Sequence, residues 1–560
     1  MPLRLRQVIF AAILAAAAGL AFAQSYGRWL DPIIDTGRDL YIPEQILRGA
    51  TLYHDVRYQY PPLAPYLLAA ITAVTGHSLA AYMVIGVVQS LLIALLLWAI
   101  ARRAAGEAAA FATALLFLAI DFTGATTWGA NFIFPYSYAA TLGMLFLLAF
   151  AGALYAATFV AQRQSPRARL WLGVAITAGI AASWCKVEYA IAVPVILIVT
   201  VIAYRLGAAA IAWFAGAQLA AIAFARWWFH DNRPGYDWIR DNVLAASLTK
   251  GETARRFFSL VSGTANWQAR TAEALVGAAL TAAVVLLLRW RERTEARASR
   301  IALAAVVVVV FLALAASGYA FFRGWGLFQV GLLIWALIKD RRTPLLFFAT
   351  LSAAATLRIP LNVAPFWYGF VLVLPVYLLI VYVLFAYLPS RGVYAKQSAL
   401  LWMALFLMLA IRDLASQRER WSLHRYPIHA ARGVLFDSNE DRARLLDAFF
   451  ARLGAMPYRT LAVFPEGITI DYLAGAQTPL SFHTFTPVET ADAAVEQQVL
   501  RELEANPPGR IAIVTRDVTE YGYREFGADY NARLAGWMRA HYHLAADWRA
   551  PRFRIVVLER

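Results

Sequence analysis

Acidic residues and arginines are concentrated in a short polar stretch near the N-terminus, residues 31–66. The stretch contains Asp31, Asp35, Asp39, Glu44 and Asp55, together with Arg38, Arg48 and Arg57. Such a set could bind a cation, relay protons or remove a proton from an attacking hydroxyl. On a helix, Asp35 and Asp39 would share a face, and their repulsion would raise the pKa of one carboxyl unless Arg38 or a metal ion intervened. A solvated loop whose acids pair with its arginines fits the spacing equally well.

The elements that must hold this stretch are membrane helices. Of the 560 residues, 61% are hydrophobic and 15% are charged, whereas soluble domains have an apolar content of roughly 45–50%. The polar stretch follows one apolar segment, at residues 7–23, and precedes a long series of others. It is therefore expected at a membrane surface, where a concentration of ionisable groups is a candidate site for chemistry.

Twelve further apolar windows follow the first segment, which gives about thirteen predicted spans. The windows lie near residues 80–101, 107–121, 136–160, 170–184, 189–205, 207–225, 272–288, 300–318, 322–338, 344–358, 366–388 and 397–411. The first segment also fits a cleavable signal peptide, because Arg4 and Arg6 precede it and the small residues Ala21 and Ala23 lie at its end. We favour a retained helix because so many spans follow.

The charge pattern predicts the orientation of the spans. The net charge of +16 could suggest nucleic acid, but much of the excess lies in short loops between apolar windows. Under the count of thirteen, these loops fall on one side, which the positive-inside rule makes cytoplasmic. The polar stretch, a long loop at 226–271 and everything after Arg412 then lie outside. We predict a multi-pass protein of the plasma (inner) membrane that contacts lipid and binds no nucleic acid.

The C-terminal part has a different pattern. Short apolar runs at 461–464, 511–515 and 553–558 indicate buried strands, and helical patterns lie near 445–450, 495–503 and 529–541. This alternation predicts a small extracytoplasmic α/β domain at residues 413–560. Residues 1–412 would form an all-α membrane domain with outer loops at 24–79 and 226–271.

Two sequence strings carry a resemblance to a known family. Asp35, Arg38 and Gly49 are followed by Tyr60-Pro61-Pro62-Leu63, and this order resembles the first outer loop of the GT-C membrane glycosyltransferases. The similarity is to protein O-mannosyltransferases and to lipid A aminoarabinose transferases, in which an Asp-Glu pair, an arginine, a glycine and a Pro-Pro-Leu motif follow one another. The second string, Ser183 to Lys186 with Glu188, resembles the lysine-bearing segment at the outer end of a mid-chain helix.

The sequence also departs from the family pattern. Thr36 stands where the family has glutamate, and Tyr60 stands where a basic residue usually precedes the prolines. That basic residue would help to hold a lipid phosphate. If the assignment is correct, Arg57 or another cation must replace it.

The resemblance implies a GT-C-like enzyme that moves a monosaccharide from a polyprenyl-phosphate donor to an acceptor hydroxyl at the outer face. Asp35 would act as the general base, with inversion at the anomeric carbon. Asp55, from its position in the same charged stretch, is a candidate second catalytic acid. The implied substrate-binding residues are Arg38, Arg57, Tyr60, Lys186 and Glu188. Cations among them would stabilise the charge that develops on the leaving phosphate. The acceptor is a glycan, a lipid or a protein, and the sugar and any requirement for a divalent cation stay open.

Simpler roles exist for the same residues. Lys186 and Glu188 would also fit a helix end whose side chains extend to the interface, Arg38 could merely neutralise Asp39, and Asp55 could be an exposed partner of Arg57. Two other classes of protein stay open. A transporter or flippase would place acids near the bilayer midplane, and a non-catalytic scaffold would present the C-terminal domain as a binding module.

Overall fold

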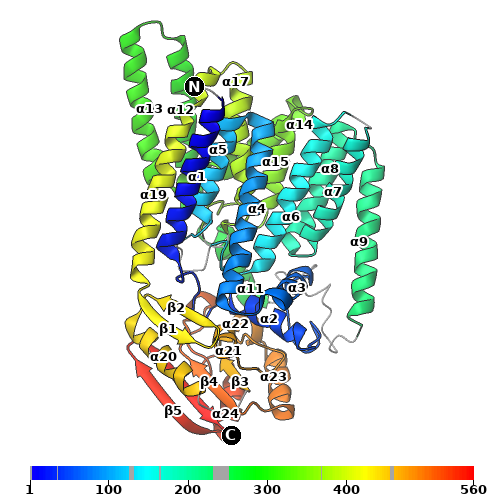
Figure 1. Cartoon of the computed structure of the whole chain (residues 1–560), viewed down its shortest axis with the longest axis vertical. Coiled ribbons are helices and arrows are strands. Elements are labelled where there is room, and N and C mark those ends of the chain that lie inside the picture. Colours follow the sequence, from blue (N-terminus) through cyan, green and yellow to red (C-terminus); the bar gives the residue numbers. More distant parts are fainter. Residues whose placement is uncertain are drawn as a thin grey trace.

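The computed structural model of the chain describes residues 3–34, 36–124, 131–162, 165–230, 251–366, 369–454 and 460–560. In these residues a bundle of long helices stands on a small domain of strands and short helices (Figure 1). This is the predicted fold class, an all-α membrane part with a small C-terminal α/β domain.

Each of the thirteen predicted apolar windows contains a helix. The helices are α1 (Leu3–Ser25), α4 (Leu79–Ala105), α5 (Glu107–Leu116), α6 (Tyr138–Tyr155), α7 (Pro166–Ser183), α8 (Val187–Tyr204), α9 (Ala209–Trp228), α12 (Trp267–Arg293), α13 (Arg297–Ser317), α14 (Tyr319–Lys339), α15 (Pro344–Ala355), α16 (Leu374–Tyr382) and α19 (Trp402–Leu423). Nine helical segments of the described chain are long and apolar enough to cross a membrane. A multi-pass membrane protein is thus confirmed, while the total of thirteen crossings stays a prediction.

Local sequence signals explain where several helices begin and end. The Ser78 side chain accepts a hydrogen bond of 3.2 Å from the Ala81 amide and caps the start of α4. Gly106 ends the same helix with a φ of 90°, which glycine adopts at low cost. Five-residue π-helical turns prolong α5 to Asp121 and α6 to Val160.

The two ends of the bundle differ. The N-terminus, α17 (Leu388–Ser390) and the connection between α12 and α13 lie at one end, which we call the far end (Figure 1). The C-terminal domain, α2 (Gly37–Leu47), α3 (Leu63–Thr75) and α11 (Gly251–Ser262) lie at the opposite end, which we call the domain end. The arginine-rich helix ends that join α12 to α13, and Arg391 after α17, are therefore far from the polar stretch that contains α2.

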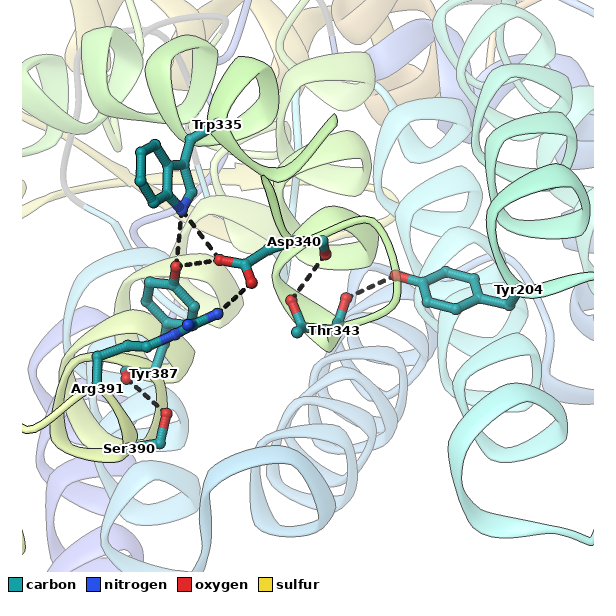
Figure 2. A network of polar contacts seen from close by, with 7 residues as sticks. All are labelled: Tyr204, Trp335, Asp340, Thr343, Tyr387, Ser390 and Arg391. Atoms are coloured by element: carbon teal, nitrogen blue, oxygen red, sulfur yellow. Dashed lines mark hydrogen bonds and ion pairs between the residues drawn. The ribbon is translucent and has the colours of Figure 1, made fainter. Parts of the chain in front are cut away.

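A buried carboxylate joins the helices at the far end (Figure 2). Asp340, directly after α14, accepts hydrogen bonds from Trp335 Nε1 at 3.0 Å and from Tyr387 Oη at 2.5 Å. It also forms an ion pair with Arg391, which follows α17. Because Asp340 satisfies three donors from two parts of the chain, it fixes the packing of these helices.

Replacing Asp340 by alanine is expected to lower the stability of the bundle without affecting the domain end. The buried Tyr387 hydroxyl would lose its acceptor, and a buried donor left without a partner costs roughly 1–3 kcal/mol. Trp335 Nε1 would keep only its hydrogen bond of 2.9 Å to the Tyr387 oxygen, and Arg391 would lose its ion pair. Thermal unfolding of the purified protein in detergent, followed by tryptophan fluorescence, measures the loss. Asp447, whose side chain is 42% exposed in its pair with His429, gives the control, and an equal melting temperature for both alanine variants would contradict the expectation.

The C-terminal domain is built on two sheets. The strands are β1 (Tyr426–Ala430), β2 (Gly433–Asp437), β3 (Leu461–Phe464), β4 (Arg510–Val514), β5 (His543–Ala550) and β6 (Phe553–Glu559). β1 and β2 form an antiparallel hairpin, and the other four have the order β3-β4-β6-β5, in which only β3 and β4 are parallel. The helices are α20 (Glu440–Gly454), α21 (Ile468–Ala474), α22 (Pro487–Thr490), α23 (Ala493–Ala505) and α24 (Ala532–His541). The three predicted strands are confirmed, and the β1–β2 hairpin and β5 were not predicted.

The domain packs directly on the polar stretch. The Tyr41 hydroxyl on α2 accepts a hydrogen bond of 3.0 Å from the Thr478 amide, and Glu44 forms an ion pair with Arg432. Tyr472 donates a hydrogen bond of 2.5 Å to the carbonyl oxygen of His77, beyond α3. α19 continues through the predicted domain boundary at residues 412 and 413 and ends at Leu423.

The two parts approach closely at Gly37, where a Cβ atom would overlap the backbone of Thr469. Gly37→Ala is therefore expected to separate α2 from α21, because such overpacking typically costs roughly 1–3 kcal/mol. Faster amide hydrogen exchange in both helices would show the separation. Gly536 has open space around it, so Gly536→Ala is the control. Unchanged exchange in Gly37→Ala would contradict the described contact.

Candidate functional site

Lys186 is the centre of a buried polar cluster at the domain end. It directly precedes α8, and only 3% of its surface is exposed. Its Nζ donates a hydrogen bond of 2.8 Å to the Tyr136 hydroxyl. The same atom lies 5.0 Å from the ring centroid of Tyr60 and 4.9 Å from that of Tyr136. The ammonium group is therefore held by contacts with two aromatic rings as well as by a hydrogen bond.

Glu188 is shared by two cations. Its Oε1 lies 3.7 Å from Lys186 Nζ and forms an ion pair with Arg358, which comes from the segment after α15. Burial alone would lower the pKa of Lys186, but Glu188 and the neighbouring tyrosines outweigh that effect and raise it. Lys186 therefore carries its charge at neutral pH. Since two cations meet one carboxylate, the cluster is suited to bind an anion.

Arg38 joins the polar stretch to this cluster. Its guanidinium lies 5.1 Å from the Tyr60 ring centroid, and its Nη2 donates a hydrogen bond of 3.2 Å to the carbonyl oxygen of Tyr136. The structure thus brings together Arg38, Tyr60, Lys186 and Glu188, four of the seven residues that the sequence assigned to the site.

Asp39 has a structural role beside them. Its carboxylate lies 3.3 Å from Arg38 Nε and accepts a hydrogen bond of 2.5 Å from the Tyr138 amide at the start of α6. A carboxylate is favourable at a helix N-terminus, where the first amides lack helical partners. Arg38 therefore neutralises Asp39 and also contacts the aromatic wall of the cluster, so the two roles considered for it coexist.

Asp55 and Arg57, which the sequence also assigned to the site, have their described contacts outside the Lys186 cluster. The Asp55 side chain is 46% exposed, pairs with His54 at 2.7 Å and accepts a hydrogen bond of 2.7 Å from the Thr51 amide. The Arg57 amide donates a hydrogen bond of 2.9 Å to the Ser481 carbonyl oxygen, and the Arg57 guanidinium lies 4.0 Å from the Phe482 ring centroid. Asp55 is thus part of an exposed turn, whereas Arg57 is held against the C-terminal domain.

Asp35 lies outside the residues that the structure describes, so its assignment as the general base stays a prediction. The residue that follows it, Thr36, is buried at the domain end. Within the described ranges, no three His, Cys, Asp or Glu side chains gather as metal ligands. The requirement for a divalent cation therefore stays open.

The C-terminal domain also reaches the cluster, which the sequence did not indicate. In the orientation that satisfies both ends of its amide, Gln59 accepts a hydrogen bond of 2.9 Å from Arg38 Nη1 and donates one of 2.8 Å to Glu489 of α22. Burial, together with the charges of Arg38 and Arg57, lowers the pKa of His483 to about 3. His483 is therefore a neutral imidazole beside two arginines.

Sequence reasoning also missed Tyr136 and Arg358. Arg358 ends the predicted apolar window 344–358, and Tyr136 begins the window 136–160. A search for polar side chains at every predicted outer end of a span would have found both. Glu489 and His483 have no comparable local signal, because they depend on how the C-terminal domain docks.

Comparison with known proteins agrees with this geometry. Residues 59–230 match a family model described as dolichyl-phosphate-mannose-protein mannosyltransferase. The matched part includes Tyr60, Tyr136, Lys186 and Glu188, that is, most of the cluster. No curated protein matches this sequence significantly.

Two solved structures have a similar fold and contain a bound lipid phosphate. ArnT from Cupriavidus metallidurans, crystallised with undecaprenyl phosphate, has a TM-score of 0.52 at 14% identity, with 99% of this chain and 98% of that chain covered. The oligosaccharyltransferase AglB from Archaeoglobus fulgidus, in complex with an inhibitory peptide and a dolichol-phosphate, has a TM-score of 0.50 at 12% identity, with 91% and 69% covered. The chain therefore has the fold of the GT-C membrane glycosyltransferases, and the predicted resemblance to this superfamily is confirmed.

Proposed function

We propose that the protein is a glycosyltransferase that takes a monosaccharide from a polyprenyl-phosphate donor and transfers it to an acceptor hydroxyl at the outer face of the membrane. The observation that carries this proposal is the cluster in which the buried Lys186 and the partly buried Arg358 share the buried Glu188. An excess of buried positive charge is costly without an anionic ligand. A lipid phosphate at the end of a membrane helix supplies that ligand.

The cluster also suits the chemistry of the leaving group. When the bond between sugar and phosphate breaks, negative charge develops on the phosphate oxygens, and cations that are already in place stabilise it without reorganisation. Tyr60 and Tyr136 hold the Lys186 ammonium, and Glu188 holds the Arg358 guanidinium. The prenyl chain would remain in the bilayer beside the membrane helices while the phosphate binds at the domain end.

The acceptor side of the reaction is assigned to the polar stretch. Asp35 would accept the proton of the attacking hydroxyl, with inversion at the anomeric carbon. Arg38 would bind substrate with its guanidinium, which lies beside the Tyr60 ring. Arg57 and His483 would border the acceptor, which is a glycan, a lipid or a protein. The exposed turn of Asp55 gives no support to its role as a second acid.

The ligands of the similar structures support a lipid-phosphate donor. ArnT was crystallised with undecaprenyl phosphate, and AglB was solved with a dolichol-phosphate and an inhibitory peptide. Both structures contain a polyprenyl-type phosphate, and the AglB structure also contains a peptide. The shared lipid phosphate therefore supports the donor class more strongly than any particular sugar or acceptor.

Reconstituted vesicles test the function. The purified chain is incorporated into vesicles that contain a panel of undecaprenyl-phosphate sugars, with mannose among them, and released undecaprenyl phosphate is measured by mass spectrometry. We expect release from at least one donor in the presence of membrane-extract acceptors. Movement of an intact donor across the bilayer without release would favour a flippase or transporter, and neither release nor movement would favour a scaffold.

A further inference from the structure

Helix α11 lies between the bundle and the C-terminal domain (Figure 1) and contacts both. Its sequence, GETARRFFSLVS, places two neighbouring phenylalanines at its centre. Ala254 and Val261 are fully buried, whereas Arg255 and Arg256 are exposed. The helix thus has one packed face and one polar face, although it is too short to cross a membrane.

The bundle side of α11 holds the segment that carries Arg358. The Arg358 guanidinium lies 4.9 Å from the ring centroid of Phe258. Close by, the Leu361 amide donates a hydrogen bond of 3.2 Å to the Ser262 carbonyl oxygen. Asn362 Nδ2 donates one of 3.3 Å to the Val261 carbonyl oxygen. These three contacts fix both the backbone of the segment and its cationic side chain.

The other side of α11 is fixed by the C-terminal domain. Phe257 and Tyr521 have ring centroids 5.7 Å apart, and a Cβ atom at Gly522 would lie 2.6 Å from Arg256 Nη1. Tyr521 belongs to a short 3-10 helix, Thr519–Tyr521. Arg516 holds this element in place through two ion pairs. One is with Glu520 of the element itself, at 3.0 Å, and the other is with Glu466, which follows β3, at 2.7 Å.

We propose that α11 is a positioning element through which the C-terminal domain orients Arg358 for the donor phosphate. In this arrangement Phe258 restricts the guanidinium, and the contact between Phe257 and Tyr521 holds α11 in place. An arginine side chain loses considerable rotamer freedom when it binds, so restricting it beforehand improves affinity. The inference rests on the proposed function, because it says that phosphate binding at this site depends on a contact made by the C-terminal domain.

Binding of undecaprenyl phosphate to the purified full-length chain in nanodiscs tests this role. Phe258→Leu keeps an apolar side chain but loses the π face, and Tyr521→Ala removes the domain contact. Both variants are expected to bind about fivefold more weakly, because the guanidinium is no longer pre-oriented. Phe258→Tyr and Tyr521→Phe keep the rings and are expected to bind within about twofold of the unmodified chain.

Two controls separate positioning from a loss of structure. Tyr523→Ala removes a ring of the same domain that packs on Tyr530 and is expected to leave binding unchanged. In an Arg358→Met background, Tyr521→Ala is expected to cause no further loss, because its effect passes through the missing guanidinium. Equal weakening by Tyr523→Ala, or a full additional loss in the Arg358→Met background, would overturn the inference.

Lys186→Met distinguishes failure of the inference from failure of the proposed function. If Lys186→Met loses binding while Phe258→Leu and Tyr521→Ala bind like the unmodified chain, the phosphate site stands and the positioning role is refuted. If Lys186→Met binds normally, the phosphate site itself is refuted, and the positioning role with it.

Discussion

Replacing Lys186 by methionine is expected to abolish specific binding of undecaprenyl phosphate and, with it, sugar transfer. Methionine retains an unbranched, apolar side chain that fits between Tyr60 and Tyr136, but it has no charge. Glu188 would then be balanced by Arg358 alone, and the excess of positive charge would disappear. Removing one buried charged partner costs roughly 2–5 kcal/mol, which corresponds to binding at least ~30-fold weaker.

Binding of undecaprenyl phosphate to the protein in nanodiscs measures this effect, and the measurement does not require the unknown acceptor. Lys339, at the exposed C-terminal end of α14, provides the matched control because it lies at the far end of the bundle. Lys339→Met is expected to bind the lipid like the unmodified chain. A Lys186→Met variant that folds, as judged by its melting temperature, and still binds with unchanged affinity would rule out the cluster as the phosphate site.

The membrane part of the fold was predictable because hydropathy is a local property. A run of apolar residues near bilayer length forms a helix wherever it lies in the chain, and every predicted window contains one. The number of crossings was harder to predict, since α5 has 10 residues and α15 has 12. Helices of this length are shorter than a perpendicular crossing requires. The strands β3, β4 and β6 were also predictable, because each contains a run of four apolar residues, LAVF, IAIV and IVVL respectively.

The hairpin of β1 and β2 was not predicted, for a physical reason. Each strand buries few apolar side chains, among them Ile428 and Leu435, and the strands are stabilised by pairing with each other and by packing on α20. Neither strand therefore has the period-2 apolar pattern of a strand that covers a core.

The candidate site was predictable only in part. Arg38, Tyr60 and Lys186 were found through a family resemblance, and their contact depends on how the polar stretch packs against α8. The ion pair of Glu188 and Arg358 joins residues 170 positions apart, and no local pattern encodes such a pairing. Asp55 was included because its stretch is rich in charge, but its turn closes on the Thr51 amide and faces solvent.

Replacing Asp35 by asparagine is expected to abolish sugar transfer while lipid-phosphate binding stays within about twofold of the unmodified chain. Asparagine has nearly the same shape as aspartate but cannot accept a proton at neutral pH. General-base catalysis contributes about 10²–10⁴-fold to a rate, so turnover is expected to fall by that factor. The phosphate site is assigned to Lys186 and Arg358, which the substitution leaves in place.

This split between turnover and binding separates a base from a structural acid. Asp31→Asn is the matched control, since Asp31 lies in the same stretch and accepts hydrogen bonds from the amides of Ile33 and Ile34 at 2.8 and 3.0 Å, which an asparagine oxygen also accepts. It is expected to retain transfer. Loss of transfer in Asp55→Asn with full activity in Asp35→Asn would move the base to the exposed turn. The acceptor would then have to approach from solvent, outside the wall formed by Arg38 and Tyr60.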